Sequence, residues 1–174
     1  NTAIDSAIAA ADSEIDQICG RTFVTPGAAT TKTYIPYDNY TVYIDDVAQT
    51  SGLVVKEDTS LDGTYDSTLT ITTDFVLTGN NAPYRVIKRV DGDLWPRDRY
   101  GRPTVSVEAY HGYQMTVPSQ ISQCALVIAA RLYQRKSSPL GFQTGGVDLG
   151  FVRISRNDPE VQSLLRGLKI MAAA

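Results

Sequence analysis

Apolar residues recur every three or four positions over the first twenty residues, the spacing of one face of an α-helix. The residues of this stripe are Ile4, Ala7, Ile8, Ala11, Ile15 and Ile18. Gly20 follows at the position where glycine commonly ends a helix. The pattern predicts an amphipathic first helix whose apolar stripe needs a covering element.

Between residues 22 and 113 the helical spacing disappears, and Thr, Val, Tyr and Ile alternate with polar residues in short runs. Turn-forming pairs such as Asp62-Gly63 and Asp91-Gly92 separate these runs. The predicted strands cover residues 31–35, 40–44, 53–57, 68–72, 84–90 and 104–110. Short strands at this spacing predict an antiparallel sheet or a small sandwich.

Helical spacing returns in VPSQISQCALVIAARLYQRKSSPLG, residues 117–141. Pro118 suits the first helical turn, where the missing N–H costs nothing. The main stripe consists of Ile121, Cys124, Ala125, Ile128 and Leu132, and it is widened to most of the circumference by Leu126, Val127, Ala129 and Tyr133. The predicted helix ends in a basic cluster, Arg131, Arg135 and Lys136, where cations favour the helix dipole.

Residues 138–157 include a Gly-rich stretch with few apolar anchors, so we expect a flexible C-terminal arm. A short helix follows, with Asp158 as its N-cap and Pro159 in its first turn. Its apolar positions are Val161, Leu164, Leu165 and Leu168. A helix of this length is marginal by itself and needs a surface to pack on.

These elements predict a single α+β domain. A small helical bundle is formed by residues 1–22 and 117–170, and an antiparallel β region, residues 30–113, is inserted into it. The two helical segments should meet, because the long helix is apolar on most sides and needs the first helix as cover. The 174 residues suffice for one domain with a proper core. Asn1 already lies within the helical pattern, and we expect further residues upstream of it.

The net charge of −3 conceals a strong asymmetry along the chain. Residues 1–80 hold 12 acidic and 3 basic residues, whereas residues 81–174 hold 7 acidic and 13 basic residues. Such polarity suits docking on a charged partner or on another copy, and it equally suits two halves that neutralise each other within one fold. Cys19 and Cys124 both lie on predicted apolar faces, so we interpret them as buried thiols of a reducing compartment.

The sequence offers no set of residues suited to catalysis or to metal binding. His111 is the single histidine, and no nucleophile motif accompanies it. DTSLDGTYDSTL, residues 58–69, imitates the start of a calcium loop but has Leu69 where a bidentate Glu is required. We therefore expect no enzyme activity, no cofactor and no metal site.

KRVDGDLWPRDRYGRP, residues 88–103, interleaves five basic residues with Trp95 and Tyr100. Such a mixture can bind single-stranded nucleic acid. Three acidic residues, Asp91, Asp93 and Asp98, weaken a phosphate-binding patch and favour a hairpin loop whose charges pair internally.

Four stretches carry a specific combination of motifs over most of the chain. They are IDQICGRTF (15–23), DGDLWPRDRYGRPTVSVEAYHGY (91–113), VPSQISQCALVIAARLYQRKSSPLG (117–141) and FVRISRNDPEVQSLL (151–165). Together they resemble the head–tail connector family of tailed bacteriophages, the adaptor proteins that form a ring beneath the portal.

The resemblance implies a small helical bundle with a β insertion and a structural role without catalysis. About twelve copies would form a homo-oligomeric ring between the portal protein and a downstream neck or tail-completion protein. The ring would extend the channel through which genomic DNA passes without sequence-specific binding. The resemblance also implies a place in the neck of the virion, after synthesis in the host cytoplasm.

In such adaptors the C-terminal segment reaches onto the portal, and a basic arm with a short amphipathic helix is typical of a segment that orders on its partner. The expected interface with the portal or a neighbouring subunit comprises Arg131, Arg135, Lys136, Arg153, Arg156, Val161, Leu164, Leu165 and Leu168. Truncation after Ser155 should then abolish portal binding and leave the fold intact. The alternative is that the last helix packs back on its own bundle.

Two other functions remain open at this point. One is a different neck or tail component, such as a stopper or a tail terminator. The other is a β-sandwich module that binds a glycan or a protein, with the helices as its scaffold.

Overall fold

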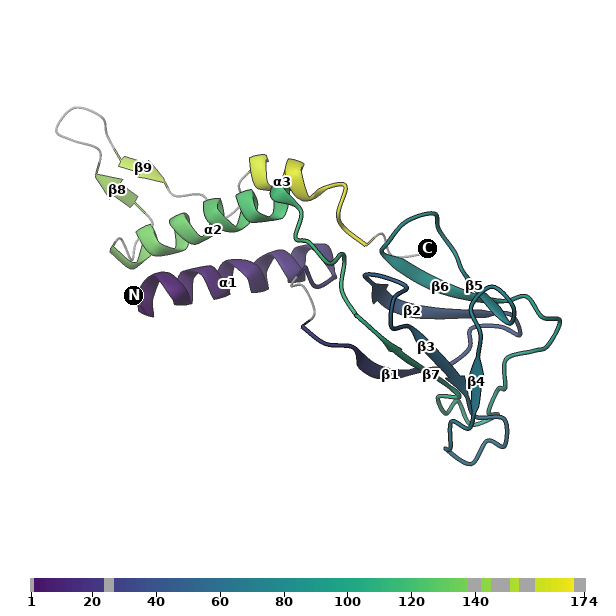
Figure 1. Ribbon diagram of the computed structural model, residues 1–174. Helices are drawn as coiled ribbons and strands as arrows, with labels where there is room; N and C mark the ends of the chain where they lie inside the picture. Colours follow the sequence, from purple (N-terminus) through teal and green to yellow (C-terminus); the bar gives the residue numbers. More distant parts are fainter. Residues whose placement is uncertain (1, 24–26, 138–141, 145–150, 154–158, 171–174) are drawn as a thin grey trace. The chain divides into compact units, whose positions relative to one another are not determined.

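The computed structural model describes residues 2–23, 27–137, 142–144, 151–153 and 159–170 (Figure 1). The chain divides into two units. A helical unit contains Asn1–Thr22 and Val117–Ala174, and a β unit, Phe23–Thr116, lies between these segments in the sequence. The protein is therefore α+β, as the sequence predicts.

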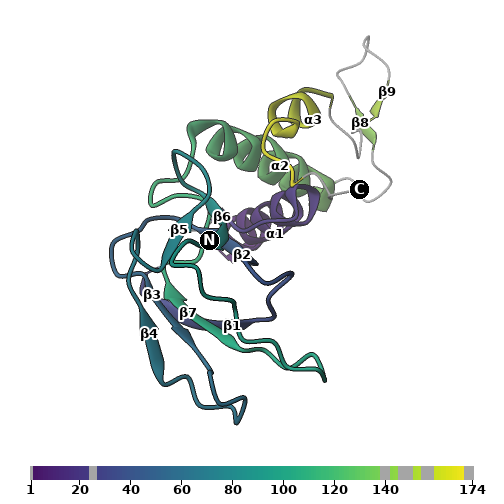
Figure 2. The same cartoon turned by 90° about the vertical axis from the view of Figure 1, so that its right-hand side faces the viewer.

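The described residues of the helical unit form three helices, α1 (Thr2–Cys19), α2 (Ser119–Ser137) and α3 (Pro159–Leu165). α1 packs along α2, and α3 packs on α2 (Figures 1 and 2). The side chains that these helices bury are Ala7, Ala11, Ile15, Cys19, Ile121, Cys124, Ile128, Ala129, Val161 and Leu165. Each helix thus buries one apolar face, which is what stabilises short helices in water.

The buried face of α1 is narrower than the predicted stripe. It consists of one residue per turn, from Ala7 to Cys19. Ile4 and Ile8 belong to the predicted stripe, yet they are 44% and 42% exposed. The helical period shows which residues share a face, but it does not show how much of that face a neighbour covers.

Gly20 ends α1 as predicted. It has a φ of 66°, and its N–H donates to the carbonyl of Asp16 at 2.8 Å. Glycine adopts this left-handed conformation without the steric penalty that a Cβ brings. The N–H of Ile170, beyond α3, donates to the carbonyl of Cys19 at 2.9 Å, so the segment after α3 is tied to the end of α1.

The segment that the sequence assigns to a flexible arm contains a strand pair. β8 (Phe142–Thr144) and β9 (Phe151–Arg153) pair antiparallel, with Phe142 opposite Arg153. The other residues of the range 138–157 lie outside the described residues. The sequence pattern missed these strands because each has only three residues.

Over the part of the β unit that the structure describes, seven strands form two antiparallel sheets. The four-stranded sheet has the order β1-β7-β3-β4, with β1 (Thr30–Tyr34), β7 (Val105–Ala109), β3 (Val54–Glu57) and β4 (Ser67–Leu69). The three-stranded sheet has the order β2-β6-β5, with β2 (Thr41–Val47), β6 (Tyr84–Arg89) and β5 (Phe75–Leu77). This arrangement is the small sandwich that the strand spacing predicts.

Both sheets contribute to one apolar core. Its buried members are Val42, Ile44, Val47, Val55, Leu69, Phe75, Ile87, Trp95, Val105, Val107 and Ala109. Along β2, buried and exposed residues alternate from Val42 to Asp46, as expected for a strand with one face on a core.

The predicted strand 68–72 is wrong beyond its first residues, and β5 was not predicted. The Asp74 carboxylate accepts a hydrogen bond from the N–H of Thr70 at 2.6 Å, and the N–H of Asp74 donates to the carbonyl of Thr70. These bonds form a turn in which Thr72 has a φ of 72°. The turn ends β4 at Leu69 and starts β5 at Phe75.

Candidate interface of the helical unit

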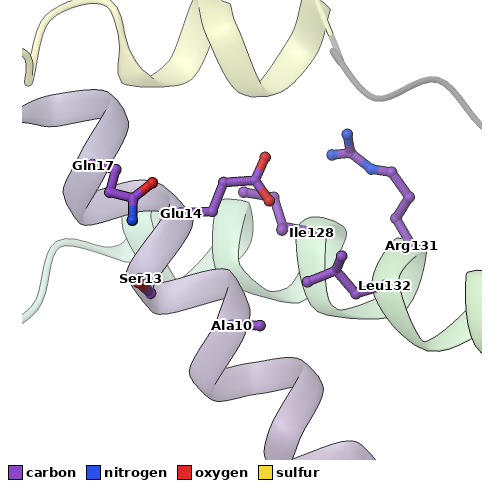
Figure 3. Close-up of a pocket in the computed structure, with 7 residues that line it drawn as sticks. All are labelled: Ala10, Ser13, Glu14, Gln17, Ile128, Arg131 and Leu132. Atoms are coloured by element: carbon purple, nitrogen blue, oxygen red, sulfur yellow. The ribbon is translucent and has the colours of Figure 1, made fainter.

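A cavity of about 420 Å³ lies between α1 and α2 (Figure 3). Its lining residues are Ala10, Ser13, Glu14 and Gln17 from α1, and Ile128, Arg131 and Leu132 from α2. In Figure 3, Glu14 extends from α1 and Arg131 from α2. Its lining combines the carboxylate of Glu14 and the guanidinium of Arg131 with the apolar side chains of Ala10, Ile128 and Leu132.

The two long helices carry opposite charge. α1 contains four acidic residues and no basic one, namely Asp5, Asp12, Glu14 and Asp16. α2 contains three basic residues and no acidic one, namely Arg131, Arg135 and Lys136. The basic residues lie near the C-terminal end of α2, where positive charge is favourable. Opposite charge favours the pairing of α1 with α2, and it also gives the unit an acidic and a basic helix for contacts with other molecules.

Only some of the predicted basic interface residues lie within the part of the chain that the structure describes. Arg131 lines the cavity between α1 and α2. Arg135 and Lys136 lie in the last turn of α2, and Arg153 ends β9. Arg156 lies outside the described residues.

The apolar residues of α3 divide into two kinds. Val161 and Leu165 are buried, with exposures of 3% and 0%, and they pack within the helical unit. Leu164 and Leu168 are half-buried. The burial of Val161 and Leu165 favours the alternative expectation, in which α3 packs on its own bundle and not on a partner. Leu164 and Leu168 are the two leucines that retain surface for a partner.

Two candidate interface residues were missed at the sequence level. Leu126 is 69% exposed and Tyr133 is 44% exposed on α2, although the sequence pattern counts both with the apolar residues of this helix. They are seven residues apart and therefore lie on the same side of the helix. The sequence feature that could have identified them is the apolar surface of α2, which is wider than one neighbouring helix can cover.

The polar segment 88–103 of the β unit pairs its charges internally, as predicted for Arg89 and Arg102. Arg89 binds Glu57 and Asp91 and lies 5.1 Å from the centre of the Trp95 ring. Arg102 forms an ion pair with Asp98 and donates to the carbonyl of Leu61. Two of the five cations are therefore already neutralised, which argues against a phosphate-binding surface.

The segment that resembles the start of a calcium loop forms a turn, which is stabilised by hydrogen bonds from backbone N–H groups to the Asp58 carboxylate. The Asp58 carboxylate is buried and accepts hydrogen bonds from the N–H groups of Asp62 and Gly63 at 3.2 and 2.7 Å. Among the described residues, no group of three or more His, Cys, Asp or Glu side chains is placed to hold a metal ion. Nor does the described part of the chain contain a helix of the length and hydropathy needed to cross a membrane.

His111 follows β7 of the four-stranded sheet and bridges to Val47, the last residue of β2 in the three-stranded sheet. Burial lowers the pKa of its imidazole, and the nearby Lys32 lowers it further. Lys32 is itself paired with Asp45 at 2.7 Å. The lowered pKa favours the neutral imidazole, and the bridge to Val47 places His111 just beyond the end of β7.

No protein-family model and no curated protein matches this chain. Two similar solved structures come from GTA (gene transfer agent, phage-like) particles. The first, "Neck of native GTA particle computed with C12 symmetry", has a TM-score of 0.59 and 16% sequence identity, and the match covers 100% of this chain and 85% of that chain. The second, "Neck of empty GTA particle computed with C6 symmetry", has a TM-score of 0.58 and 16% identity, with coverage of 99% and 80%. At this identity the match shows a shared fold, which is consistent with the resemblance to head–tail connectors.

Proposed function

We propose that this protein, which has the fold of a chain from the neck of GTA particles, is a head–tail adaptor of a phage or phage-like virion. Copies of it form a ring under the portal, extend the DNA channel and link the capsid to the tail. The observation that carries the proposal is the extent of the fold match, which covers 100% of this chain and includes both of its units.

The symmetry of the similar structures supports the ring. One neck was computed with C12 symmetry and the other with C6 symmetry, so both contain repeated copies around an axis. A subunit of such a ring has to offer two different surfaces to its two neighbours. The acidic α1 and the basic α2 are two surfaces of this kind.

The arrangement of charge supports passage of DNA without sequence-specific binding. Two of the five cations in the segment 88–103 are bound by carboxylates of the same unit. The first 80 residues, moreover, carry a net negative charge. A wall that does not hold phosphates lets DNA slide along it.

The proposed contact with the portal uses the basic residues and the half-buried leucines near the C-terminus. They are Arg131, Arg135, Lys136, Arg153, Arg156, Leu164 and Leu168. Val161 and Leu165 act indirectly in this proposal, because their burial holds α3 on the bundle. For the same reason, truncation after Ser155 would remove two buried anchors, and the expectation that it spares the fold is revised.

Charge reversal tests the contact without removing α3. Arg153→Glu and Arg156→Glu, separately and together, should weaken binding to the cognate portal assembly in a gradient co-sedimentation experiment. Lys56→Glu is the matched control, because it makes the same charge change at an exposed position of β3 in the β unit. Binding by both single variants equal to that of the Lys56→Glu control would contradict this contact.

The fold match supports a second neck function equally, because the similar structures are whole necks in which the layer of the matching chain is not specified. A stopper or a tail terminator would bind tail components and not the portal. Co-sedimentation of the wild-type protein with tail components, but not with the portal, would support that function in place of the adaptor.

A further inference from the structure

The helical unit buries the two cysteines of the chain, one on each of its long helices. Cys19 is the last residue of α1 and is 1% exposed, and Cys124 lies in the second turn of α2 and is fully buried. Cys19 follows the buried Ile15 by about one turn. Cys124 lies between the buried Ile121 and Ile128. Both cysteines therefore belong to the faces on which α1 and α2 pack together.

The two cysteines lie at the same level of the helix pair. α1 and α2 run in opposite directions (Figure 1). The cavity between them is lined by residues between 10 and 17 of α1 and between 128 and 132 of α2, so the centres of these stretches lie opposite each other. Moving about five residues toward the end of α1, and as many toward the start of α2, reaches Cys19 on one helix and Cys124 on the other.

The electrostatics of Cys19 agree with this placement. Burial raises the pKa of the Cys19 thiol, and the nearby Lys169 and Arg21 oppose this effect in part. Cys124 is among the groups that raise the same pKa. A second thiol has this effect only when it lies close, because charge on one sulfur disfavours charge on the other.

The spacing of packed helices suits a bond between the two sulfurs. The axes of packed helices lie about 8–10 Å apart and each Cα lies about 2.3 Å from its axis, so facing Cα atoms are roughly 3.5–5.5 Å apart. Cα atoms that are joined by a disulfide are usually about 4.4–6.8 Å apart. The small side chains of Ala7 and Ala11 on the buried face of α1 favour a close approach of the helices. Cysteines at facing positions can thus be bridged without moving either helix.

We propose that Cys19 and Cys124 form a redox-sensitive pair, which is a dithiol in a reducing environment and, in an oxidising one, a disulfide that locks α1 to α2. The setting rests on the proposed function, because a virion protein is made inside a cell, where thiols stay reduced, and is then released into an oxidising medium. The bond itself depends only on the two side chains.

The oxidant is a small-molecule disulfide such as oxidised glutathione. The thiolate of one cysteine attacks a sulfur of the oxidant, which releases one glutathione and leaves a mixed disulfide on the protein. The thiolate of the other cysteine attacks the protein sulfur of this mixed disulfide and expels the second glutathione. The protein dithiol gives up two electrons and two protons, and one glutathione disulfide becomes two thiols. Because both cysteines are buried, the first attack is slow and needs a brief local opening of the helical unit.

The disulfide closes a loop that contains the whole β unit, Phe23–Thr116. A crosslink restricts the unfolded chain, and the effect grows with the length of the closed loop. We expect oxidation to lower the equilibrium constant for unfolding of the helical unit about 30-fold or more.

Oxidation of the full chain tests the pair. Purified protein is incubated with oxidised glutathione, denatured in the presence of N-ethylmaleimide and digested with trypsin. Mass spectrometry should find a disulfide that links two peptides, residues 1–21 and 100–131, and no alkylated cysteine. A non-reducing gel should show the oxidised protein as a monomer. Urea unfolding followed by circular dichroism should have its midpoint at a higher urea concentration after oxidation.

Ala7→Cys/Cys19→Ala is the matched control, because it keeps two cysteines on the buried faces and moves one of them about three turns along α1. At about 1.5 Å per residue the new thiol lies about 18 Å from the level of Cys124, beyond the reach of a disulfide. This variant should form no internal disulfide. Circular dichroism and a thermal melt check that it is folded.

Four results would overturn the pair. They are glutathione adducts or alkylated cysteines in place of the linked peptides, linkage only between two molecules, equal linkage in the control, and equal urea midpoints before and after oxidation. Portal binding by the reduced wild type is measured in parallel. A protein that binds the portal but forms no internal disulfide refutes the pair and spares the adaptor function. A protein that forms the disulfide and binds no portal refutes the adaptor function alone.

Discussion

Arg89 of β6 donates a hydrogen bond to the carboxylate of Glu57 of β3, and this ion pair joins the two sheets of the β unit. Both side chains are almost fully buried, with exposures of 4% and 7%. Arg89 also binds Asp91 at 2.9 Å, so its guanidinium is satisfied from two directions. Removing one member of a buried pair leaves the other charge without compensation.

We therefore predict that Arg89→Leu lowers the free energy of unfolding of the β unit by about 3 kcal/mol or more. Lys88→Leu is the matched control: Lys88 precedes Arg89 on β6, points to the opposite face and is exposed. Its effect should stay within about 0.5 kcal/mol. Urea unfolding followed by the fluorescence of Trp95, the single tryptophan, measures both. Equal transition midpoints for the two variants would show that the pair does not hold the sheets together.

The single histidine gives a direct pH test of the β unit. Because burial and Lys32 lower its pKa, His111 should titrate below its ordinary value of 6.5 in NMR spectra of the folded protein. The folded state then favours the neutral imidazole. Its contribution to stability is present above pH 6.5 and is lost as the pH falls through the lowered folded pKa.

Lys32→Gln should move the His111 pKa upward, because it removes a nearby positive charge and releases Asp45 from its ion pair. Lys56→Gln, on the exposed side of β3, should leave that pKa unchanged. An NMR titration in which the two variants shift His111 equally would show that Lys32 does not act on it.

Tyr34 gives a second pH test, at the alkaline end. Burial raises the pKa of its phenol to about 12, against a smaller opposing effect of the Asp45 N–H that donates to its oxygen. A raised pKa in the folded state favours the neutral phenol, so this contribution to stability is complete below pH 10 and is lost as the pH rises toward 12.

Tyrosinate absorbance after a rapid pH jump should show one late ionisation that Tyr34→Phe removes. Tyr100→Phe, at a tyrosine that is 73% exposed, should leave that late ionisation in place. Persistence of the late ionisation in Tyr34→Phe would assign it to a different tyrosine.

The packing of α3 gives a stability test of the helical unit. Leu165 is completely buried, so Leu165→Ala should destabilise the unit by about 2–5 kcal/mol. Ser163→Ala, at an exposed position of the same helix, should change stability by less than about 0.5 kcal/mol.

The reactivity of the two buried cysteines reports local unfolding of the helical unit without a denaturant. Cys19 and Cys124 are buried, and burial raises the pKa of the Cys19 thiol, so both should react slowly with a thiol reagent in the native protein. Leu165→Ala should speed their reaction, and Ser163→Ala should not. Fast reaction in the wild type would mean that α3 does not stay packed on the bundle.

The sequence predicted those features that a local pattern determines. The helical period and Gly20 placed α1, and Pro118 and Pro159 placed the starts of α2 and α3 within about a residue. Alternation located six of the seven strands of the β unit. It missed β5 because an Asp74 side chain, rather than a Gly or Pro, makes the turn before it.

The interface residues were harder to predict, because exposure depends on which neighbour covers a face. The spacing of Leu126 and Tyr133 is compatible with a core position, and only their observed exposure separates them from Ile128. Conversely, Val161 and Leu165 have the spacing of a docking face, but α3 buries them within its own unit.

Imaging the protein bound to its portal tests the adaptor function most directly. Purified protein is mixed with the cognate portal assembly and examined by negative-stain electron microscopy, with the portal alone and the Arg153→Glu/Arg156→Glu variant as controls. The adaptor function predicts an added ring of density at the narrow end of the portal with the wild type, weakened with the variant. A well-folded wild-type protein that adds no density would contradict it.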